Sequence, residues 1–349
     1  MSKALVSVLI PVYNSSKFLD EAVKSIICQT YANIEIIITD DGSTDDSLDV
    51  IRRYKDNRIK LITHEKNQGL IFTRNEAVAM AKGEYIAFLD SDDISSSDRI
   101  EKQLKFLEEN TDFGMTGSWV QMIDEKGNRL NDSLKFPAKP EEIPVILLFK
   151  NYFTTSSIMV RKSCLPDQPF DPDFPIAEDY NLWVKIAEKH KVWNLPEVLT
   201  YYRVHEENIH KVFRQKMQDM DVLQLSKQLS KLDTDFSEQE KQFFYLIGKI
   251  DNTEEYELFL KTDFAFGDSC LRKLLKANDS AQRYNNEILY GYIFKLWLQL
   301  FVSIEKYNIL LYHKIKYSVF FRKISFINRL KFFLKCMIHF NSAKRLKLS

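Results

Sequence analysis

Short runs of β-branched residues alternate with amphipathic helical patterns over the first hundred residues of the chain. The predicted elements, in order, are a strand at 5–11, a helix around 19–27, a strand at 34–39, a helix ending near Tyr54, a strand at 58–63, a helix at 73–81 and a strand at 84–90. Strands that alternate with helices in this way form a mostly parallel sheet with helices on both faces. The sequence therefore predicts an α/β fold whose ligands bind beyond the carboxyl ends of the strands, where the strand order reverses.

Polar and acidic clusters follow three of the predicted strands. They read Pro-Val-Tyr-Asn at 11–14, Asp-Asp-Gly-Ser at 40–43 and Asp-Ser-Asp-Asp at 90–93. Such residues are also common in turns and at helix N-caps, so each cluster taken alone has a structural explanation. Three clusters at three strand ends instead indicate a polar ligand site at one edge of the sheet.

Two carboxylates separated by one residue, Asp90 and Asp92, lie in the third cluster. Mg²⁺ and Mn²⁺ favour a few protein carboxylates, with phosphate oxygens and water completing the coordination shell. A cation held by this pair would neutralise the charge on a departing diphosphate. A lone D-x-D arises often by chance, so the pair predicts a metal site only together with its surroundings.

Four segments occur in order over roughly residues 5–100, namely LVSVLIPVYN, IIITDDGSTDDS, KNQGLIFTRNEAV and GEYIAFLDSDD. Together they resemble the donor-binding half of glycosyltransferase family 2, whose Rossmann-like nucleotide-sugar fold is called GT-A. The resemblance implies an enzyme that uses Mn²⁺ or Mg²⁺ and transfers a sugar from a UDP-sugar to a hydroxyl group. It further implies inversion in a single displacement, with a glycan or lipid-linked oligosaccharide of bacterial polysaccharide biosynthesis as the acceptor.

The resemblance also assigns residues to the nucleotide. The expected set is Pro11, Val12, Tyr13, Asn14, Asp40, Arg74, Asp90 and Ser91. In this set Asp40 accepts a uracil N–H, Tyr13 stacks on the base, and Arg74 lies near the base and phosphates. The simpler alternatives are that Tyr13 packs in the core and that Arg74 pairs with Glu76 or Asp92.

The same resemblance gives Asp90, Asp92 and His205 as metal ligands, with His205 closing the site. A single histidine next to aromatic residues is more often packed or solvated than ligating, and this alternative stays open. The other five histidines, at positions 64, 190, 210, 313 and 339, form no ligand spacing.

Asp179 is the expected general base, because the string from Ala177 to Trp183 resembles the family's acidic pair ahead of an aromatic-bearing helix. A neighbouring carboxylate, Glu178, should raise the proton affinity of Asp179, which suits proton abstraction near neutral pH. Glu178 and Trp183 are assigned to the acceptor side. The alternative is that the acidic pair only stabilises a helix N-terminus.

The pattern after the first hundred residues is less regular. Residues 119–130 resemble a hairpin, a loop-rich stretch follows, and from about Lys211 the pattern is helical, with a capping box at 237–240. The expected domains are a GT-A domain at 1–210, with a nucleotide-binding half at 1–100 and an acceptor-side half at 101–210, and a helical C-terminal region at 211–349 with a basic amphipathic tail at 306–349.

The charge is unevenly distributed along the chain. Of 49 basic and 49 acidic residues, 11 basic and no acidic residues follow Glu305, so the preceding part carries 38 basic against 49 acidic residues, a net charge of −11. The tail residues expected on one apolar helical face are Phe326, Leu330, Phe333, Leu334 and Met337, with Lys331 and Lys335 opposite. Such a helix predicts peripheral contact with an anionic membrane, and the alternative is packing on the catalytic domain. Nucleic-acid binding is disfavoured, because no known module surrounds the basic stretch.

The chain is expected in the cytoplasm, peripheral to the inner face of the membrane. The four cysteines form no short metal-ligand spacing or disulfide framework, and Pro11 interrupts the N-terminal apolar run before it reaches signal-peptide form. The most apolar window, Ile288–Ile304, contains Lys295 and predicts a buried or interfacial helix.

Two other functions compete with glycosyl transfer. A sugar nucleotidyltransferase usually carries a glycine-rich loop after its first strand, and the stretch at 11–18 contains no glycine. A catalytically inactive scaffold at the membrane is the non-enzymatic alternative, against which every matched catalytic position is occupied. A dehydrogenase is disfavoured because no G-x-G-x-x-G follows a strand.

Overall fold

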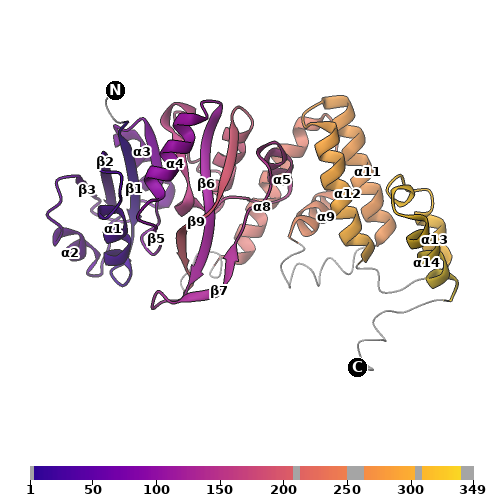
Figure 1. Cartoon of the computed structure of the whole chain (residues 1–349), viewed down its shortest axis with the longest axis horizontal. Helices are drawn as coiled ribbons and strands as arrows, with labels where there is room; N and C mark the ends of the chain where they lie inside the picture. The colour runs from indigo at the N-terminus through magenta and orange to yellow at the C-terminus, as the bar shows by residue number, and fades with distance from the viewer. Residues whose placement is uncertain (1–3, 207–212, 250–262, 303–308, 339–349) are drawn as a thin grey trace. The chain divides into compact units, whose positions relative to one another are not determined.

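The computed structural model describes residues 4–206, 213–249, 263–302 and 309–338. The chain divides into two compact units (Figure 1). The first comprises Met1–Pro144 and Asn151–Met220, and the second comprises Val145–Lys150 and Asp221–Ser349. The division lies at residue 220 rather than at the expected 210, and the segment 145–150 groups with the C-terminal helices.

A nine-stranded mixed sheet runs through the first unit. Its strands are β1 (Val6–Val12), β2 (Ile34–Asp40), β3 (Ile59–Thr63), β4 (Tyr85–Phe88), β5 (Ile94–Ser95), β6 (Phe113–Ile123), β7 (Arg129–Leu134), β8 (Met159–Arg161) and β9 (Lys191–Arg203). They lie in the order β3-β2-β1-β4-β8-β6-β9-β5, with β7 paired to β6. The first four strands in this order pair in parallel, whereas β8 is antiparallel to both of its neighbours. The predicted parallel α/β sheet is confirmed, with antiparallel strands added by the second half of the unit.

Helices cover both faces of this sheet. They are α1 (Leu19–Ile27), α2 (Ser47–Arg52), α3 (Leu70–Met80), α4 (Arg99–Glu109) and α6 (Glu178–Ala187). Apolar residues of α1, α2 and α4 pack against Val6, Val8 and Ile10 on one face of β1. Because the strand order reverses between β3 and β4, a right-handed crossover places α3 on the opposite face. Coverage on both sides explains why every residue of β2 is buried.

The reversal of strand order locates the ligand-binding edge. β1 lies between β2 and β4, with Val12 opposite Asp40 and Leu9 opposite Phe88. The chain segments that follow these three strands therefore begin at the same edge of the sheet. This is the edge at which the sequence places its three polar clusters.

Two strands of the second half were not predicted. β8 has only three residues, and β9 contains Pro196 and pairs in parallel with β6 through register shifts around Trp119. Such shifts interrupt the period-two alternation on which strand prediction depends. The hairpin predicted at 119–130 is confirmed, because β6 and β7 pair antiparallel around Gly127, whose φ is +82°.

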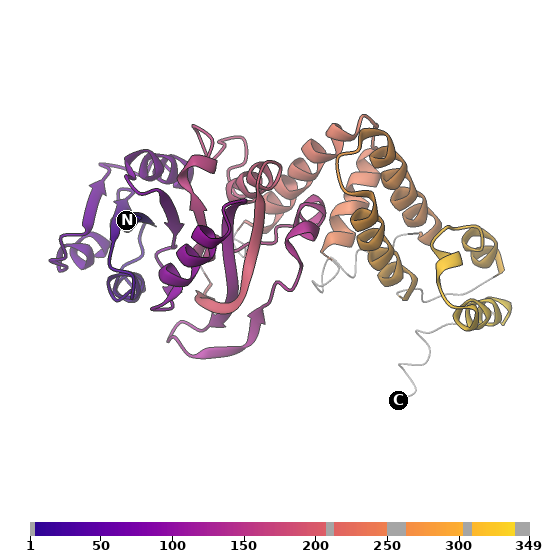
Figure 2. The same ribbon diagram turned by 45° about the horizontal axis from the view of Figure 1, so that its top comes forward.

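The second unit is helical, as predicted. The helices that lie wholly or partly in it are α5 (Ile143–Phe149), α8 (Arg214–Leu229), α9 (Glu238–Gly248), α11 (Phe264–Ala281), α12 (Asn286–Val302), α13 (Ile309–Ile315) and α14 (Phe326–Met337). α11 and α12 lie side by side (Figure 1, Figure 2). The predicted capping box is confirmed, since Ser237 and Glu240 each bond the other's backbone N–H. α12 is the predicted buried helix and packs Trp297 into the core. In the part of the chain that the structure describes, no helix is long and apolar enough to cross a membrane.

A buried aspartate joins three segments of the helical unit. Asp268 of α11 accepts hydrogen bonds from Trp297 Nε1 at 2.8 Å, from Ser318 Oγ at 2.5 Å and from Arg272 Nε at 2.9 Å. Both the tryptophan and the serine are buried. Removing this carboxylate would leave their donors unsatisfied away from water.

Replacing Asp268 with alanine should therefore lower the free energy of unfolding by about 3 kcal/mol, because two buried donors lose their acceptor. Urea unfolding followed by circular dichroism would measure the loss. Asp279→Ala, at an exposed position of the same helix, is the matched control and should change stability little. Equal stability of the two variants would contradict a structural role for Asp268.

Candidate active site

The residues predicted at the end of β1 differ in accessibility. Val12 is buried in the core, so it can offer a ligand only its main chain, and Pro11 is half-buried. Tyr13 lies just beyond the strand and exposes 49% of its surface. The alternative that Tyr13 packs in the core is therefore wrong, and its ring is accessible for stacking on a planar ligand.

Asn14 and Ser91 form hydrogen bonds that connect the chain segments around the site. Asn14 has a left-handed backbone with φ +48°, and its side-chain oxygen accepts the N–H of Thr44 at 2.8 Å. The N–H of Asn14 donates to Ser43 Oγ at 3.0 Å. Ser91 Oγ donates to Ser15 Oγ at 2.7 Å. These bonds tie together the segments that follow β1, β2 and β4.

Asp40 carries an unused acceptor. It is the last residue of β2 and is only 2% exposed. Its Oδ2 receives the N–H of Ser43 at 3.4 Å, whereas its Oδ1 is buried without a partner among the described residues. A buried carboxylate oxygen without a donor is costly, and an N–H group of a ligand would satisfy it.

Arg74 of α3 is a buried cation between two carboxylates. One guanidinium nitrogen donates to Asp90 Oδ1 at 2.6 Å, and the other donates to Glu178 Oε1 at 2.5 Å. The partners of Arg74 are therefore Asp90 and Glu178, rather than Glu76 or Asp92. This pair of contacts joins the end of β4 to the start of α6.

Glu178 and Asp179 lie in the first turn of α6. This position is the one expected if the pair also stabilises the helix N-terminus. Burial raises the pKa of Glu178 to about 7, although the charge of Arg74 opposes the shift. Burial also raises the pKa of Asp179, against a hydrogen bond that Thr155 Oγ1 donates at 2.8 Å. A carboxylate whose pKa is raised is a better proton acceptor near neutral pH.

Asp92 and His205 lie close together although they are 113 residues apart in the sequence. His205 follows β9, and its Nε2 lies 2.9 Å from Asp92 Oδ2. Asp90 is the neighbouring carboxylate, with one oxygen bound by Arg74. Oxygen donors with one imidazole suit Mn²⁺ or Mg²⁺ when phosphate oxygens complete the shell. Among the described residues, no group of three or more His, Cys, Asp or Glu side chains is arranged so that it could hold a metal ion.

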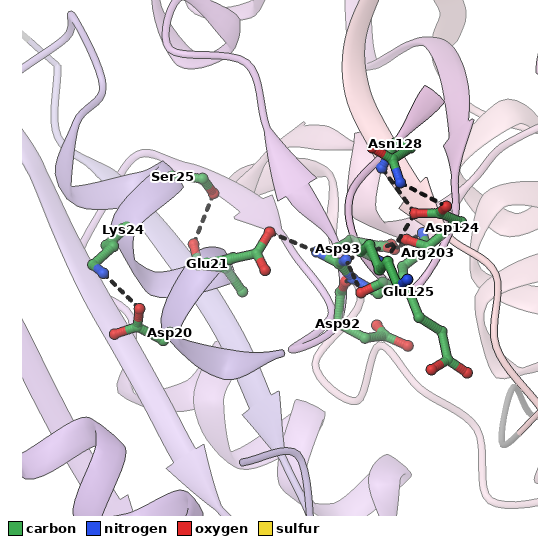
Figure 3. A network of polar contacts seen from close by, with 12 residues as sticks. Asp20, Glu21, Lys24, Ser25, Asp92, Asp93, Asp124, Glu125, Asn128 and Arg203 are labelled. Atoms are coloured by element: carbon green, nitrogen blue, oxygen red, sulfur yellow. Dashed lines mark hydrogen bonds and ion pairs between the residues drawn. The ribbon is translucent and has the colours of Figure 1, made fainter. Parts of the chain in front are cut away.

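Sequence reasoning missed two residues behind this pair, Asp93 and Arg203. Both are fully buried, and the N–H of Arg203 donates to Asp93 Oδ1 at 2.9 Å (Figure 3). Burial raises the pKa of Asp93 well above its ordinary value. The available signal for Arg203 was a cationic residue directly after the strand-like run at 198–202, two positions before His205.

A histidine excluded by its spacing also lies beside the site. His64 follows β3, its Nδ1 is 2.7 Å from Asp41 Oδ1, and its Nε2 is 2.8 Å from Glu76 Oε2. Asp41 also accepts the N–H groups of Gln68 and Gly69. Burial alone would lower the pKa of His64, but its bonds to the two carboxylates outweigh burial and raise that pKa. The position at the end of a parallel strand was the signal that could have found it.

Trp183 is completely buried and packs edge-on against Phe88, with ring centroids 5.9 Å apart. The assignment of Trp183 to the acceptor side is therefore corrected, because its ring belongs to the core. This ring contact packs α6 against β4 of the sheet. Glu178 is also buried and bound to Arg74, so it supports the site from within.

Comparison with known sequences identifies relatives across this unit. The sequence model of glycosyl transferase family 2 matches residues 7–165. A glycosyltransferase of Haemophilus influenzae is 34% identical over 226 residues, which cover 62% of this chain and 70% of the relative. The Escherichia coli UDP-Glc:alpha-D-GlcNAc-diphosphoundecaprenol beta-1,3-glucosyltransferase WfaP is 37% identical over 203 residues, which cover 58% of this chain and 78% of that protein.

Solved structures share the fold. Staphylococcus aureus TarS in complex with UDP-GlcNAc superimposes with a TM-score of 0.55 at 20% identity, over 85% of this chain and 89% of that chain. The mannosyltransferase PcManGT from Pyrobaculum calidifontis, in complex with GDP-Man and Mn²⁺, gives 0.51 at 17% identity over 85% of both chains. The predicted GT-A fold is confirmed by these similarities.

Replacing His64 with asparagine should destabilise the protein more at about pH 6 than at about pH 9. The folded-state pKa of His64 is raised, so its stabilising effect is complete below the unfolded-state pKa of about 6.5 and is lost as the pH rises through the folded-state pKa. Urea unfolding of both proteins across this range would measure the difference.

Glu76→Gln is the matched control for His64, because it keeps the shape of the partner and removes one charge. It should weaken the pH dependence without abolishing it. A difference between His64→Asn and the parent protein that does not vary with pH would contradict this explanation.

Proposed function

Because this chain belongs to glycosyl transferase family 2, whose members use nucleotide-sugar donors, we propose that it transfers a sugar from a UDP-sugar to a hydroxyl group of a lipid-linked oligosaccharide or other glycan. The pathway that we propose is bacterial polysaccharide biosynthesis. WfaP takes UDP-Glc and a diphosphoundecaprenol-linked GlcNAc, which supports both the donor and the acceptor class. Two features carry the proposal: the buried Oδ1 of Asp40, which has no partner among the described residues, and the exposed ring of Tyr13, which directly follows the strand residue paired with Asp40.

Donor recognition follows from these two residues. Uracil presents a ring N–H, which Asp40 Oδ1 would accept at the end of β2. The Tyr13 ring would then stack on the base, since aromatic faces bind planar rings without needing a hydrogen bond. The Asn14 and Ser91 contacts hold the surrounding segments in place.

Asp92 and His205, with Asp90 beside them, would hold Mn²⁺ or Mg²⁺ on the diphosphate. When bound, the cation neutralises the charge of the leaving nucleoside diphosphate. PcManGT holds Mn²⁺ together with GDP-Man, which supports a metal-dependent donor site in this fold.

Asp179 is the proposed base of a single inverting displacement. Its carboxylate accepts the proton of the acceptor hydroxyl as that oxygen attacks the anomeric carbon, and the bond from this carbon to the diphosphate oxygen breaks. Thr155 and Asn151 donate to Asp179 Oδ2 at 2.8 and 3.3 Å and orient the carboxylate. Glu178, bound to Arg74, positions the start of α6 rather than reacting.

The competing functions fit the site less well. A scaffold without activity has no need for a buried Asp40 acceptor that finds no partner in the described part of the chain, or for the raised pKa of Asp179. A nucleotidyltransferase would need a phosphate-binding loop after β1, where this chain instead places Asn14 in a left-handed turn that bonds Thr44.

Calorimetric titration with UDP, GDP, ADP and dTDP, each with Mn²⁺ and with EDTA, tests the donor site. We expect UDP to bind in a metal-dependent manner and more tightly than the other nucleotides, because Asp40 would accept the ring N–H of uracil while Tyr13 stacks on the base. Failure of all four nucleotides to bind would overturn the donor assignment and favour the scaffold.

Two variants separate the roles in the same experiment. Asp179→Asn should leave UDP binding nearly intact and reduce the transfer rate by a factor of about 100 to 10,000, since it removes the proton acceptor. Asp92→Ala should weaken metal-dependent UDP binding as well as transfer. Equal residual turnover and equal UDP affinity in the two variants would contradict the assignment.

The membrane contact that we propose rests on α14. This helix packs its Phe332 and Cys336 into the helical unit, next to Phe301 and Tyr312. Its other face is apolar and exposed and consists of Phe326, Ile327, Leu330, Leu334 and Met337, and the exposed Ile338 follows directly after the helix. Of the apolar residues expected on this face, only Phe333 is half-buried. The helix lies within the tail at 306–349, which carries 11 basic and no acidic residues. An exposed apolar face in such a basic tail fits the surface of an anionic bilayer.

The full-length protein should float with liposomes that contain phosphatidylglycerol and should remain behind with neutral phosphatidylcholine liposomes. Leu330→Glu combined with Leu334→Glu should abolish flotation, because two charges enter the apolar face. Met80→Glu, at an exposed apolar position of α3, is the control and should float like the parent. Flotation of the double variant, or none by the parent, would refute membrane contact through α14.

A further inference from the structure

Arg203 is a fully buried cation that no step of the proposed transfer uses. It is the last residue of β9, and its side chain contacts residues from three other segments of the first unit (Figure 3). A buried guanidinium is costly unless its N–H donors are bound. Its partners therefore show what its presence stabilises.

Two bonds join Arg203 to the segment that carries Asp92. Its Nε donates to the carbonyl oxygen of Asp92 at 2.8 Å, and its main-chain N–H donates to Asp93 Oδ1 at 2.9 Å. One bond is made to the main chain of Asp92 and the other to the Asp93 side chain, so neither uses the Asp92 carboxylate. The position of that carboxylate is nevertheless determined by the peptide that Arg203 holds.

Arg203 and His205 also share a contact with the ring of Phe18. The guanidinium carbon of Arg203 lies 4.8 Å from the centroid of this ring, and the imidazole centroid of His205 lies 5.1 Å from it. Guanidinium groups stack favourably on aromatic faces. Arg203 thus supports both members of the Asp92–His205 pair, one through the backbone and one through a shared aromatic ring.

The remaining donors of the guanidinium hold it in place. One nitrogen donates to the carbonyl oxygens of Asp124 and Glu125 in the turn between β6 and β7, at 3.3 and 3.0 Å. The other donates to Glu21 Oε2 of α1 at 3.0 Å. The planar fork of an arginine can satisfy all of these acceptors together, whereas a lysine ammonium has only three donors at one point.

We propose that Arg203 is a positioning residue that holds Asp92 and His205 in the arrangement needed to bind the divalent cation. The inference rests on the proposed metal-dependent donor site and adds a residue to it. Groups that orient metal ligands without touching the metal typically affect metal affinity by a factor of about 10 to 100. Arg203 should therefore set the metal affinity of the site without contacting donor or acceptor.

The test is Arg203→Lys in the full-length protein, titrated with Mn²⁺ in the presence of UDP. We expect Mn²⁺ to bind about 10 times more weakly or worse, with the transfer rate restored at high Mn²⁺ concentration. Arg161→Lys is the matched control, since Arg161 also donates to main-chain carbonyls and lies on β8 next to Tyr85, at the opposite end of β4. This control should leave Mn²⁺ affinity unchanged.

The outcomes separate this inference from the proposed function. If the parent protein fails to bind Mn²⁺ with UDP, the metal-dependent donor site itself is wrong. If the parent binds Mn²⁺ and Arg203→Lys binds it equally well, the positioning role is wrong. Loss of activity that added Mn²⁺ does not restore would likewise overturn it.

A second variant covers the case in which Arg203→Lys does not fold. Glu21→Gln removes one charged acceptor at the half-exposed end of the network and leaves the buried contacts in place. It should weaken Mn²⁺ binding measurably while the protein stays folded. Unchanged Mn²⁺ affinity in this folded variant would count against the inference.

Discussion

The guanidinium of Arg74 is the interaction on which the candidate site depends. It is buried between Asp90, at the end of β4, and Glu178, at the start of α6. One cation thereby joins the nucleotide-binding half of the unit to the half that carries the proposed base. These three charged groups are stable only as a set, because loss of one of them leaves the others uncompensated.

The charge balance of the site follows from the same constraint. Several carboxylates lie at the edge of the sheet where we propose that an anionic diphosphate binds. They belong to the segments 90–93 and 178–179. Arg74 and Arg203 are buried among them, and each is bound to one acidic segment or more. The buried cations offset part of this negative charge, and the proposed divalent cation would offset more of it. Burial raises the pKa values of both Glu178 and Asp179.

The first hundred residues could be predicted because their strands are buried on both faces. Such strands read as short apolar runs, and β1, β2 and β4 lie close to the expected positions. β9 could not be predicted, since Pro196 and its irregular register with β6 hide the strand pattern. The helical C-terminal region was recognisable from its capping box and from the apolar stretch that became α12.

The candidate site was predictable only where a motif marked it. Asp40, Arg74 and Asp92 lie in recognisable strings, and the structure brings them to one edge of the sheet. The partners of His64 and Arg203 are remote in the sequence, so no short sequence motif predicts these contacts. Trp183 was misassigned because an aromatic residue after an acidic pair can face either a ligand or the core.

The short excursion of the chain at 145–150 limits how this protein can be divided. Val145, Leu148 and Phe149 of α5 belong to the apolar core of the helical unit, although sheet residues precede and follow them in the sequence. Phe149 packs against Phe244 and Tyr292, and the carbonyl of Leu147 accepts a bond from Gln228. A gene truncated after residue 220 would encode the sheet together with an apolar helix that has lost its partners. The helical unit is therefore not an exchangeable module, and any chimaera that swaps it must replace two separate pieces of the chain.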